Sequence, residues 1–571
     1  MNSIIPLRVG IGLVLALLLA GCTNAHYRKT ADRDVYRAIK QKSAQVPDTD
    51  PHFTIEQTNA LSLEGYPVAT NVLDALGPYG ERERNASILR LEDALVIAVE
   101  HSRAYQSRKE QLYLDALALT LARHQFTPIF SANGSAAFSG QTEQALRYEI
   151  DEVTGEIVPV LSDNLVEQQN VRGSGNVGVS WLIDGVGKLT AAFTTDFLRF
   201  VTGDPRTVTS SQLGAQFTRP LLRNAGYKAD MEALTQAERQ MVYDLRDFVR
   251  YRRDFSVQIA TAYYGALGLR DVVRNSYLNL QSSRLNADRT RALAQEGRVT
   301  QSDLGRLAQQ VLSSESTWIN SIRNYRQALD NFKFQLGLDV DANIVLDDAE
   351  LEALRIQHPG ISPEDSIRVA LAARLDLITV KEQLEDAERK VKLAANFLLP
   401  SVDLATAVSI NSNPDKSTGV QLPDPQRYRY SAELSVDPGL DKTTERDAYR
   451  TALITRDRAA RQVDQQEDEI KLEVRDSWRS LEQAKRSFEI SEVGVQIAER
   501  RVEEQNLLAE LGRAKAQDQV DAQNDLANSK NQRTQALVTH TIARLQFWNN
   551  IGILYIKDRG QWEEIKDAKT Q

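Results

Sequence analysis

The sequence predicts a mainly α-helical protein that carries a membrane β-barrel part and is built from two tandem repeats. Three observations support this fold class. Motifs recur at fixed spacings in the two halves of the chain, long stretches show a seven-residue apolar repeat, and shorter stretches alternate between apolar and polar residues. The first observation sets the domain organisation, and the other two separate helices from strands.

The amino terminus has the pattern of a cleaved export signal. Arg8 supplies a positive charge, residues 9–20 form a short apolar run, and small residues precede Cys22, the one cysteine of the chain. The run is too short to span a bilayer, so we expect residues 1–21 to be a signal peptide.

The stretch Leu-Ala-Gly-Cys resembles the lipobox of bacterial lipoproteins, which implies a lipid on Cys22. An ordinary secretory signal with a chance cysteine is the alternative. Thr23 follows, whereas an Asp at this position usually retains lipoproteins in the inner membrane, so the resemblance points to the outer membrane.

Composition and the distribution of reactive residues argue against several classes of function. The net charge of −9 argues against nucleic acid as a partner. The six histidines are scattered, and a lipidated Cys22 leaves no thiol for a disulfide or a metal. Without a Gly-rich phosphate loop or a nucleophile beside a base, we expect no catalytic residues, no metal and no cofactor apart from the lipid. No stretch after the signal is apolar over 18 residues, so we expect no transmembrane helix, whereas a transmembrane β-barrel remains possible because the signal of each of its strands is weak.

The chain contains two copies of one pattern. The motif KEQL occurs at 109–112 and again at 381–384, an offset of 272, and Pro128 and Pro400 have the same offset. Farther along, an offset of 215 aligns EGRVTQSDL at 296–304 with LGRAKAQDQ at 511–519. The first copy therefore holds 57 extra residues, and the duplication determines the architecture.

Both copies contain a long stretch with a heptad repeat. In the second copy the repeating positions are Val474, Leu481, Phe488, Val495, Val502 and Ala509. Their counterparts in the first copy are Ile259, Ala266, Val273, Leu280, Ala287 and Ala294. A strict seven-residue repeat predicts helices that wind into a left-handed supercoil.

We expect each long helix to reverse at a glycine and return as a coiled-coil hairpin. The first helix runs over 221–296 and turns at Gly297, and the second turns at Gly512. At about 1.5 Å per residue the first would be about 110 Å long, which exceeds a compact globular core. The returning helices end at about Leu336 and Ile551. Two shorter helices are expected to begin with acids in their first turn, Glu92–Asp93 and Glu364–Asp365, after the caps Ser87 and Ser362.

Between helices, the apolar period changes to two. The alternating runs have their apolar members at Phe130, Ala132, Ala136, Phe138, Val177, Val179, Trp181, Leu189, Ala191, Phe193, Leu213, Ala215, Phe217, Val402, Leu404, Val408, Ile410, Tyr428, Tyr430, Ala432, Leu434 and Val436. An apolar face opposite a polar face over about ten residues fits the strands of a membrane barrel. We expect four strands within 129–219 and two at 401–410 and 428–437; two plus two is the alternative.

The connections between these strands differ in length. The segment 184–187 has the composition of a tight turn, whereas 139–173 is long and polar and is expected to be a loop. Short turns on one side and long loops on the other are typical of outer-membrane barrels.

The order of helix, strands and heptad hairpin, repeated behind a lipobox, resembles the TolC-like outer membrane factor family. The more specific segments are LAANFLLPSVDL at 393–404, FTRPLL at 217–222 and ELGRAKAQDQVDAQNDL at 510–526. The resemblance implies a homotrimeric periplasmic α-barrel joined to a shared outer-membrane β-barrel. It implies an exit duct of a tripartite efflux or type I secretion system, with no catalysis.

The resemblance also implies partners and a location. The partners would be outer-membrane lipid, a periplasmic adaptor (membrane fusion) protein and an inner-membrane transporter of the RND, ABC or MFS type. The protein would be lipid-anchored in the outer membrane with a large periplasmic part. Independently of the family, four to six strands from one chain cannot close a barrel in lipid, so several copies are required. Three chains would give 12 strands in the usual family plan, or 18 if the extra hairpin joins the wall.

The expected domains follow the duplication. They are a signal peptide with lipobox at 1–21, a lipidated extension and equatorial segment at 22–87, a first repeat at 88–338 with its periplasmic tip near 297–303, an equatorial linker at 339–362, a second repeat at 363–556 with its tip near 512–518, and a polar tail at 557–571.

The resemblance assigns functional positions at the two helical turns. In the family, carboxylates after the second turn constrict the pore, and the matching residues here are Asp518 and Asp521, with Asp303 in the first repeat. The alternative is that these three aspartates are solvent-exposed residues on charged helices without a role in a gate. The adaptor-docking tips would be Gly297, Arg298, Val299, Thr300, Gly512, Arg513, Ala514 and Lys515.

One departure from the family concerns how the pore is held closed. Well-studied members flank the second turn with a Tyr and an Arg, and this chain has Ala509 and Ala514 there. Arg513 or Arg298 is the expected substitute. A non-conducting coiled-coil scaffold tethered to the membrane is the rival function, and the strands at equivalent places in both repeats argue against it.

Overall fold

The computed structural model describes residues 24–56, 63–70, 73–150, 155–202, 207–225, 231–296, 300–413, 421–511, 513, 515–557 and 560–562. The signal peptide and Cys22 lie outside these ranges, as do Gly297, Arg298, Val299, Gly512, Ala514 and most of the tail. Within the described ranges, none of the helices combines the length and the apolar character needed to span a membrane.

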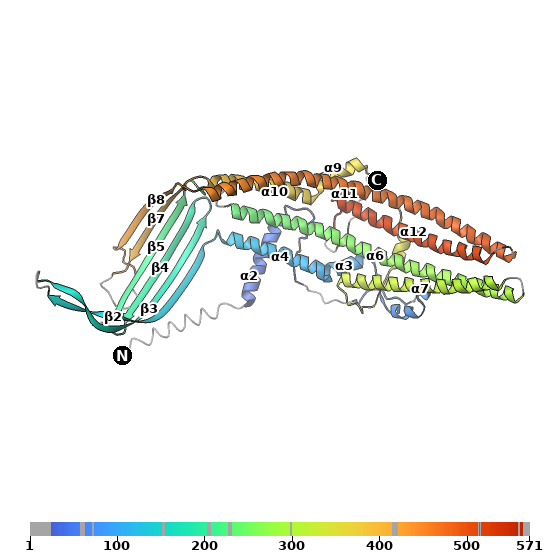
Figure 1. Ribbon diagram of the computed structural model, residues 1–571, viewed down its shortest axis with the longest axis horizontal. Coiled ribbons are helices and arrows are strands. Elements are labelled where there is room, and N and C mark those ends of the chain that lie inside the picture. Colours follow the sequence, from blue (N-terminus) through green and yellow to red (C-terminus); the bar gives the residue numbers. More distant parts are fainter. Residues whose placement is uncertain are drawn as a thin grey trace. The chain divides into compact units, whose positions relative to one another are not determined.

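The chain folds into two units, each built from both repeats. A helical unit comprises 1–116, 241–383 and 460–571, and a strand-bearing unit comprises 117–240 and 384–459. Figure 1 shows the long strands gathered in one sheet, which has six strands, and the longest helices in extended antiparallel pairs. Each repeat therefore supplies strands to one unit and a helical hairpin to the other.

The helices are mainly long. In chain order they are α2 (Asn24–Ser43), η1 (Asp74–Glu83), α3 (Leu91–His101), α4 (Arg103–His124), α6 (Glu232–Gln295), α7 (Gln301–Leu336), α8 (Asp348–Ala353), α9 (Pro363–Ala373), α10 (Leu375–Phe397), α11 (Thr443–Glu510) and α12 (Ala516–Ile551). The prediction of a mainly helical chain with strands is confirmed.

The boundaries of the helices repeat at the two offsets found in the sequence. The first residues of α3 and α9 differ by 272 in number, and so do those of α4 and α10. Helices α7 and α12 begin and end at an offset of 215. Both end at a glycine with a left-handed backbone, Gly337 with φ 83° and Gly552 with φ 86°. Glycine takes this conformation without the steric cost that a Cβ would add, so the two helices stop at equivalent points.

The heptad positions form the buried face of the long helices. Ile259, Val273 and Leu280 of α6 are fully buried, and so are Val474 and Leu481 of α11. Small residues accompany them, since Ser276, Ser283, Ala484, Ser491 and Ala498 are all buried. Large side chains opposite small ones let neighbouring helices approach closely along a supercoiled seam.

One core of the helical unit shows how the second repeat packs. Ala370 of α9, Leu377 of α10, Val474 of α11 and Phe547 of α12 belong to a single buried cluster. The equivalent of Phe547 in the first repeat, Phe332, is also almost completely buried. A buried aromatic at the same place in both copies anchors each returning helix to its partner.

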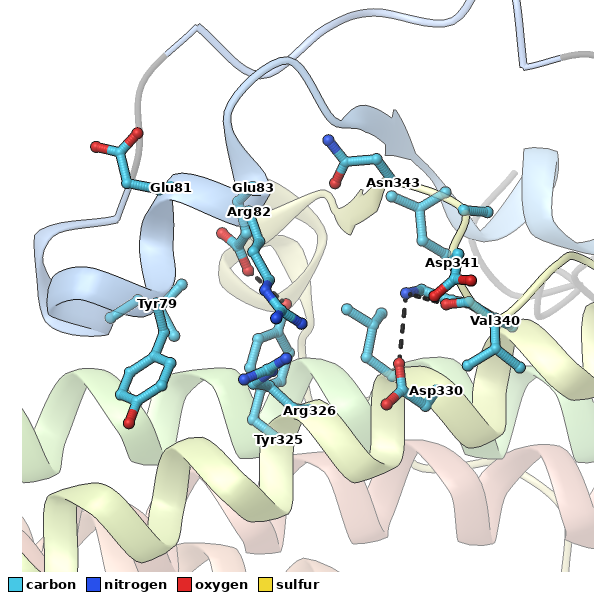
Figure 2. A pocket seen from close by; sticks show the side chains of 15 residues that line it. Tyr79, Glu81, Arg82, Glu83, Tyr325, Arg326, Asp330, Val340, Asp341 and Asn343 are labelled. Atoms are coloured by element: carbon cyan, nitrogen blue, oxygen red, sulfur yellow. Dashed lines mark hydrogen bonds and ion pairs between the residues drawn. The ribbon is translucent and has the colours of Figure 1, made fainter.

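The segments on either side of the first repeat meet in a short parallel sheet. Strand β1 (Ser87–Leu89) pairs with β6 (Ile344–Leu346). Next to this sheet is a pocket of about 450 Å³. Its lining includes Tyr79, Arg82 and Glu83 of η1, which lie over Tyr325 of α7 (Figure 2).

A buried ionic group fixes these segments to the hairpin of α6 and α7. Arg270 donates to the Glu83 carboxylate at 2.9 Å, and the Tyr325 hydroxyl donates to its other oxygen at 3.0 Å. Burial raises the pKa of Glu83 above its usual value, although Arg270 opposes the shift. A buried ion pair of this kind makes removal of either partner costly, because the other charge would be left uncompensated.

The second unit contains a six-stranded antiparallel sheet. Its strands are β2 (Ile129–Ile150), β3 (Ile157–Ile183), β4 (Gly187–Phe200), β5 (Thr207–Pro220), β7 (Ser401–Asn411) and β8 (Tyr428–Asp437), in the spatial order β2-β3-β4-β5-β7-β8. The expectation of four strands from the first repeat and two from the second is confirmed. The expected turn at 184–187 is also present, and a Cβ on Gly187 would collide with the Thr218 carbonyl.

Three expectations about these boundaries are wrong. The polar segment 139–173 is not a loop, because β2 continues to Ile150 and β3 begins at Ile157. Beyond the point where β4 ends, this hairpin has no third strand beside it among the described residues, so neither of its faces needs to be apolar and its sequence shows no period of two.

The other two corrections concern helix starts. The long helix does not begin at Leu221, because the Leu221 N–H donates to the Val402 carbonyl at 2.7 Å and so prolongs the sheet. Ser87 is not a helix cap, since it pairs with Ile344 in β1 and Arg90 occupies the cap position of α3. In the second repeat, Ser362 caps α9 as expected.

A buried histidine of α12 makes the stability of the folded protein sensitive to pH. His540 of α12 is fully buried, and neither ring nitrogen has a hydrogen-bond partner among the described residues. Burial, together with Arg544, His358 and Lys485, lowers its pKa to about 4. The facing side chains from the other elements are His358, whose ring nitrogen lies 3.3 Å from Glu482, and Trp478 of α11, whose ring centroid is 5.3 Å from that of His358.

Lowering the pH should therefore destabilise the folded protein. The unfolded state takes up a proton at His540 near pH 6.5 and the folded state only near pH 4, so stability falls through this window. Between pH 7 and pH 5 we expect a loss of about 2 kcal/mol, most of which His540→Leu removes. Denaturant unfolding at both pH values measures the difference. His52→Leu, at an exposed histidine, is the control; an equal pH dependence in wild type and His540→Leu would contradict the assignment.

Candidate functional site

The six-stranded sheet has one continuous apolar face. One row of paired positions crosses all six strands through Phe130, Val179, Ala191, Ala215, Val408 and Tyr430. The next row runs through Ala132, Val177, Phe193, Leu213, Ile410 and Tyr428. Because paired positions share a face, all four strands of the first repeat and both strands of the second contribute to one apolar surface.

Large side chains on this face are exposed. The exposed fraction is 79% for Phe130, 59% for Val177 and 75% for Tyr430. Other large apolar side chains of the same face with more than a third of their surface exposed are Phe138, Trp181, Phe197, Leu213, Val408, Tyr428, Leu434 and Val436. A surface of this extent on one side of a sheet indicates contact with an apolar medium or another protein.

The opposite face carries small and polar side chains. One row holds Asn133, Asn176, Thr194 and Gln212, and a neighbouring row holds Ser131, Gly178, Ala192, Gly214 and Ser409. Its charged residues come from both signs: Arg172, Lys188 and Arg429 against Asp196, Asp403, Glu433 and Asp437. Such a face is suited to water.

The ends of the strands next to the helices are marked by polar contacts. The Trp181 indole N–H donates at 3.2 Å to the Phe126 carbonyl, just after α4. In the helices that lead into the sheet, the buried Asp386 side chain of α10 lies 2.9 Å from Arg239 of α6 and 2.9 Å from Arg389. Arg389 also binds Glu232 at 2.6 Å. This ionic group fixes the start of α6 against α10, close to the edge of the apolar band.

The helical tips hold the three acids that the sequence singled out. Asp303 lies in the first turn of α7, where its backbone N–H donates to the Thr300 hydroxyl at 3.2 Å. Asp518 lies in the first turn of α12, and Asp521 follows one turn later. The Asp518 side chain is exposed, whereas Asp521 is half-buried and accepts from Gln517 at 2.9 Å.

The two tips of one chain lie side by side. Ala287 of α6, Leu307 of α7 and Ala516 of α12 form one buried cluster, with Val311 and Val520 packed against it. The first turns of α7 and α12, and with them Asp303 and Asp518, therefore belong to one end of the helical unit. Of the predicted docking positions, Thr300, Arg513 and Lys515 are described, and all three are exposed.

Sequence reasoning missed a polar ladder between the two hairpins. Asn275 of α6 donates to Asn531 of α12 at 3.0 Å, and Gln310 of α7 donates to Asn524 at 2.8 Å. Thr534 of α12 donates to Asp271 at 2.6 Å. Amide side chains at a helix interface stabilise one register over others, because any shift leaves them unpaired. The signal was the presence of Asn and Gln in the paired helices, which the apolar repeat does not reveal.

The described residues hold no group of three or more His, Cys, Asp or Glu side chains placed to bind a metal ion. Together, the arrangement offers an apolar surface on one unit and acid-bearing helical tips on the other.

No family model matches the chain, and no curated protein matches it. Solved structures do. The outer-membrane protein VceC from Vibrio cholerae is 14% identical, with a TM-score of 0.58, over 81% of this chain and 96% of VceC. The outer-membrane channel OprN is 12% identical, with a TM-score of 0.57, over 88% of this chain and 98% of OprN.

A third similar structure is the CmeC outer-membrane channel of Campylobacter jejuni. It is 13% identical, with a TM-score of 0.54, over 91% of this chain and 97% of CmeC. OprN and CmeC are outer-membrane channels and VceC is an outer-membrane protein, and the match extends over nearly the whole length of each. The chain thus has the fold of outer-membrane channels, which is the architecture of the TolC-like outer membrane factors that its sequence resembles.

Proposed function

We propose that this protein is an outer-membrane exit duct, the TolC-like component of a tripartite efflux or type I secretion system. The observation that carries the proposal is the six-stranded sheet with an exposed apolar face and a polar opposite face. Lipid on one side and water on the other is the environment that such a sheet fits. The likeness in fold to outer-membrane channels supports the same assignment.

The working unit is a homotrimer. Within one chain, β2 and β8 each pair with a single neighbouring strand, so each has one edge without partners among the described residues. Backbone groups at an open edge cannot be left unpaired in lipid. Since β2 and β8 run in opposite directions, β8 of one copy can pair antiparallel with β2 of the next and close a ring.

The helical hairpins form the periplasmic part of the duct. Their heptad faces are buried within one chain, while Leu285 of α6, Leu312 of α7 and Ile490 of α11 are exposed at 70%, 62% and 64%. Side chains of this kind are suited to contacts between copies in a shared α-barrel. The N-terminal lipid on Cys22 would hold the trimer to the outer membrane as a second anchor.

The tips are the docking surface for a periplasmic adaptor, which links the duct to an inner-membrane transporter of the RND, ABC or MFS type. Support comes from the exposed Arg513 and Lys515 beside the second turn and from the capped start of α7 at Thr300. Asp518 and Asp521, with Asp303 nearby, form the periplasmic gate. In a trimer, Asp518 and Asp521 would bring six carboxylates together and favour cations.

A non-conducting scaffold is the alternative. Two observations disfavour it. The chain has a six-stranded sheet, which a coiled-coil scaffold does not need. The apolar face of this sheet is exposed, and no other element among the described residues covers it. A soluble scaffold would also be expected to keep such a face buried.

Purified protein inserted in planar lipid bilayers should conduct ions in discrete steps. The physical reason is that a closed wall with a polar inner face holds water across the membrane. Single-channel recording of the full mature chain provides the measurement, with detergent buffer alone as the control. Protein that inserts, as shown by protection from protease, but never conducts would favour the scaffold.

The two faces of the sheet should respond differently to a charge. Val177→Arg places a cation on the lipid-facing side and should cost about 2–4 kcal/mol if it lies near the midplane. Asn176→Arg, one residue earlier on the opposite face, is the matched control and should be tolerated. The amount of heat-resistant trimer in outer-membrane fractions compares them. Equal yields of both variants would contradict the assignment of faces.

Removing the gate carboxylates should widen the closed pore. Asp518→Ala combined with Asp521→Ala deletes six charges per trimer and should raise the single-channel conductance and weaken the preference for cations. The control removes two exposed acids from the middle of α11, Asp468→Ala with Asp476→Ala, and should leave the conductance as it is. A gate variant indistinguishable from wild type would refute the role of these two residues.

A further inference from the structure

The first repeat contributes two more strands than the second, and all six lie in one sheet. Strands β2 to β5 come from the first repeat, whereas β7 and β8 come from the second. The excess corresponds to one hairpin and to the 57 extra residues of the first copy. The width of the proposed shared barrel depends on whether this additional hairpin joins the barrel wall or folds outside it.

The additional strands continue the apolar face without a break. Trp181, Val179 and Val177 of β3 lie in the same rows as Leu189, Ala191 and Phe193 of β4, and in both rows that cross all six strands they join positions from β2, β5, β7 and β8. A hairpin folded outside the wall would have no reason to place its apolar side chains in register with those of the wall. β3 and β4 therefore belong to the membrane-facing surface.

The apolar band also shows the tilt that a closed barrel needs. In β2 the band runs from Phe130 to Phe138, and in β8 from Tyr428 to Val436, with Phe130 and Tyr430 in the same row. From β2 to β8, which are five strands apart, the centre of the band thus shifts by about six residues along the strand direction. With about 3.3 Å per residue and about 4.8 Å between strands, this shift corresponds to a tilt of about 40°. Strands of membrane barrels tilt by about 35–45°.

We propose that three copies close an 18-stranded barrel, wider than the twelve-stranded barrel of the family plan, and that this mouth passes bulky hydrophilic solutes. The proposal rests on the proposed function and specifies its barrel. At a tilt of about 40°, the backbone diameter would be about 36 Å for 18 strands and about 24 Å for 12. After about 5 Å for side chains on each side, the free radius would be about 13 Å against about 7 Å.

The inner face sets the chemistry of the solutes. Its rows consist mostly of Ser, Thr, Asn, Gln, Gly and Ala, and its charged residues include both basic ones (Arg172, Lys188 and Arg429) and acidic ones (Asp196, Asp403, Glu433 and Asp437). Arg172 and Asp196 lie 3.9 Å apart, so part of this charge is compensated locally. A wall of this kind selects weakly by charge, in contrast to the acid-bearing tips. The outer end of the duct is therefore suited to select solutes by their size rather than by their charge.

The register permits a matched narrow variant. Phe138 pairs with Val171, Val171 with Arg199, and Arg199 with Thr207, so Phe138 and Thr207 would oppose each other if β3 and β4 were absent. Replacing Ser139–Arg206 by Asn-Gly joins β2 to β5 through a two-residue hairpin turn. The apolar rows remain in phase, because Ala132 would then face Leu213, and the trimer would have 12 strands.

The test measures which neutral polymers enter the outer mouth. Polyethylene glycols of graded size are added on the barrel side of a bilayer that holds single channels, and the reduction of conductance marks entry. Wild type should admit polymers up to a radius about twofold larger than the narrow variant admits. Equal cut-offs for the two proteins, or a wild-type cut-off at the free radius calculated for 12 strands, would overturn the wide barrel.

If the narrow variant fails to assemble, electron cryomicroscopy of the wild-type complex distinguishes an 18-stranded barrel from a 12-stranded one. A projection of the sheet region with 18 strands supports the proposal. A ring of 12 strands with β3 and β4 outside it would overturn the proposal, while the duct itself would stand. Absence of any ring and of any conductance would instead remove the proposed function.

Discussion

Backbone hydrogen bonding at the edges of the sheet is the constraint on which this structure depends. β2 and β8 end a six-stranded sheet whose outer face is apolar and exposed. In water, open edges invite aggregation, and in lipid they cannot be tolerated at all. Among the described residues of one chain nothing pairs with these two edges, so the proposed duct requires an assembly in which the edges of neighbouring copies pair with one another.

In the helical unit, apolar seams and buried polar contacts hold the long helices in a fixed register. These long helices pair along heptad seams, and buried polar contacts fix their register: Asn275 to Asn531, and Gln310 to Asn524. Apolar packing alone would allow adjacent heptads to slip, whereas an amide displaced from its partner loses its hydrogen bond. The group formed by Glu83, Arg270 and Tyr325 then ties the flanking segments to α6 and α7. Each hairpin is thus held in one position before any partner binds.

Much of this organisation could be predicted from the sequence. The offsets of 272 and 215 recur as helix boundaries, and the heptad positions are buried or half-buried, because both follow from local pattern. The sheet was predictable where one face had to be apolar. It was not predictable in 139–173, where the β2–β3 hairpin extends past its neighbours and no face is constrained.

The remaining differences have physical causes of the same kind. Leu221 was assigned to a helix, but its N–H completes the sheet, a long-range pairing with β7 that no local pattern reports. Ser87 has the composition of a cap yet lies in a strand paired with β6, which comes from the far side of the first repeat. Of the candidate functional positions, Asp303, Asp518 and Asp521 lie at or near helix starts, as the alignment of the repeats required. The polar ladder between the hairpins was not foreseen, because it depends on which helices meet.

The mass of the complex extracted in mild detergent tests the central claim most directly. Multi-angle light scattering, corrected for bound detergent, should give a protein mass of three chains with no concentration-dependent dissociation, since each open edge is paired by a neighbour. A stable monomer that retains its strand content in circular dichroism would contradict the account, because its sheet edges would then be open in an apolar environment.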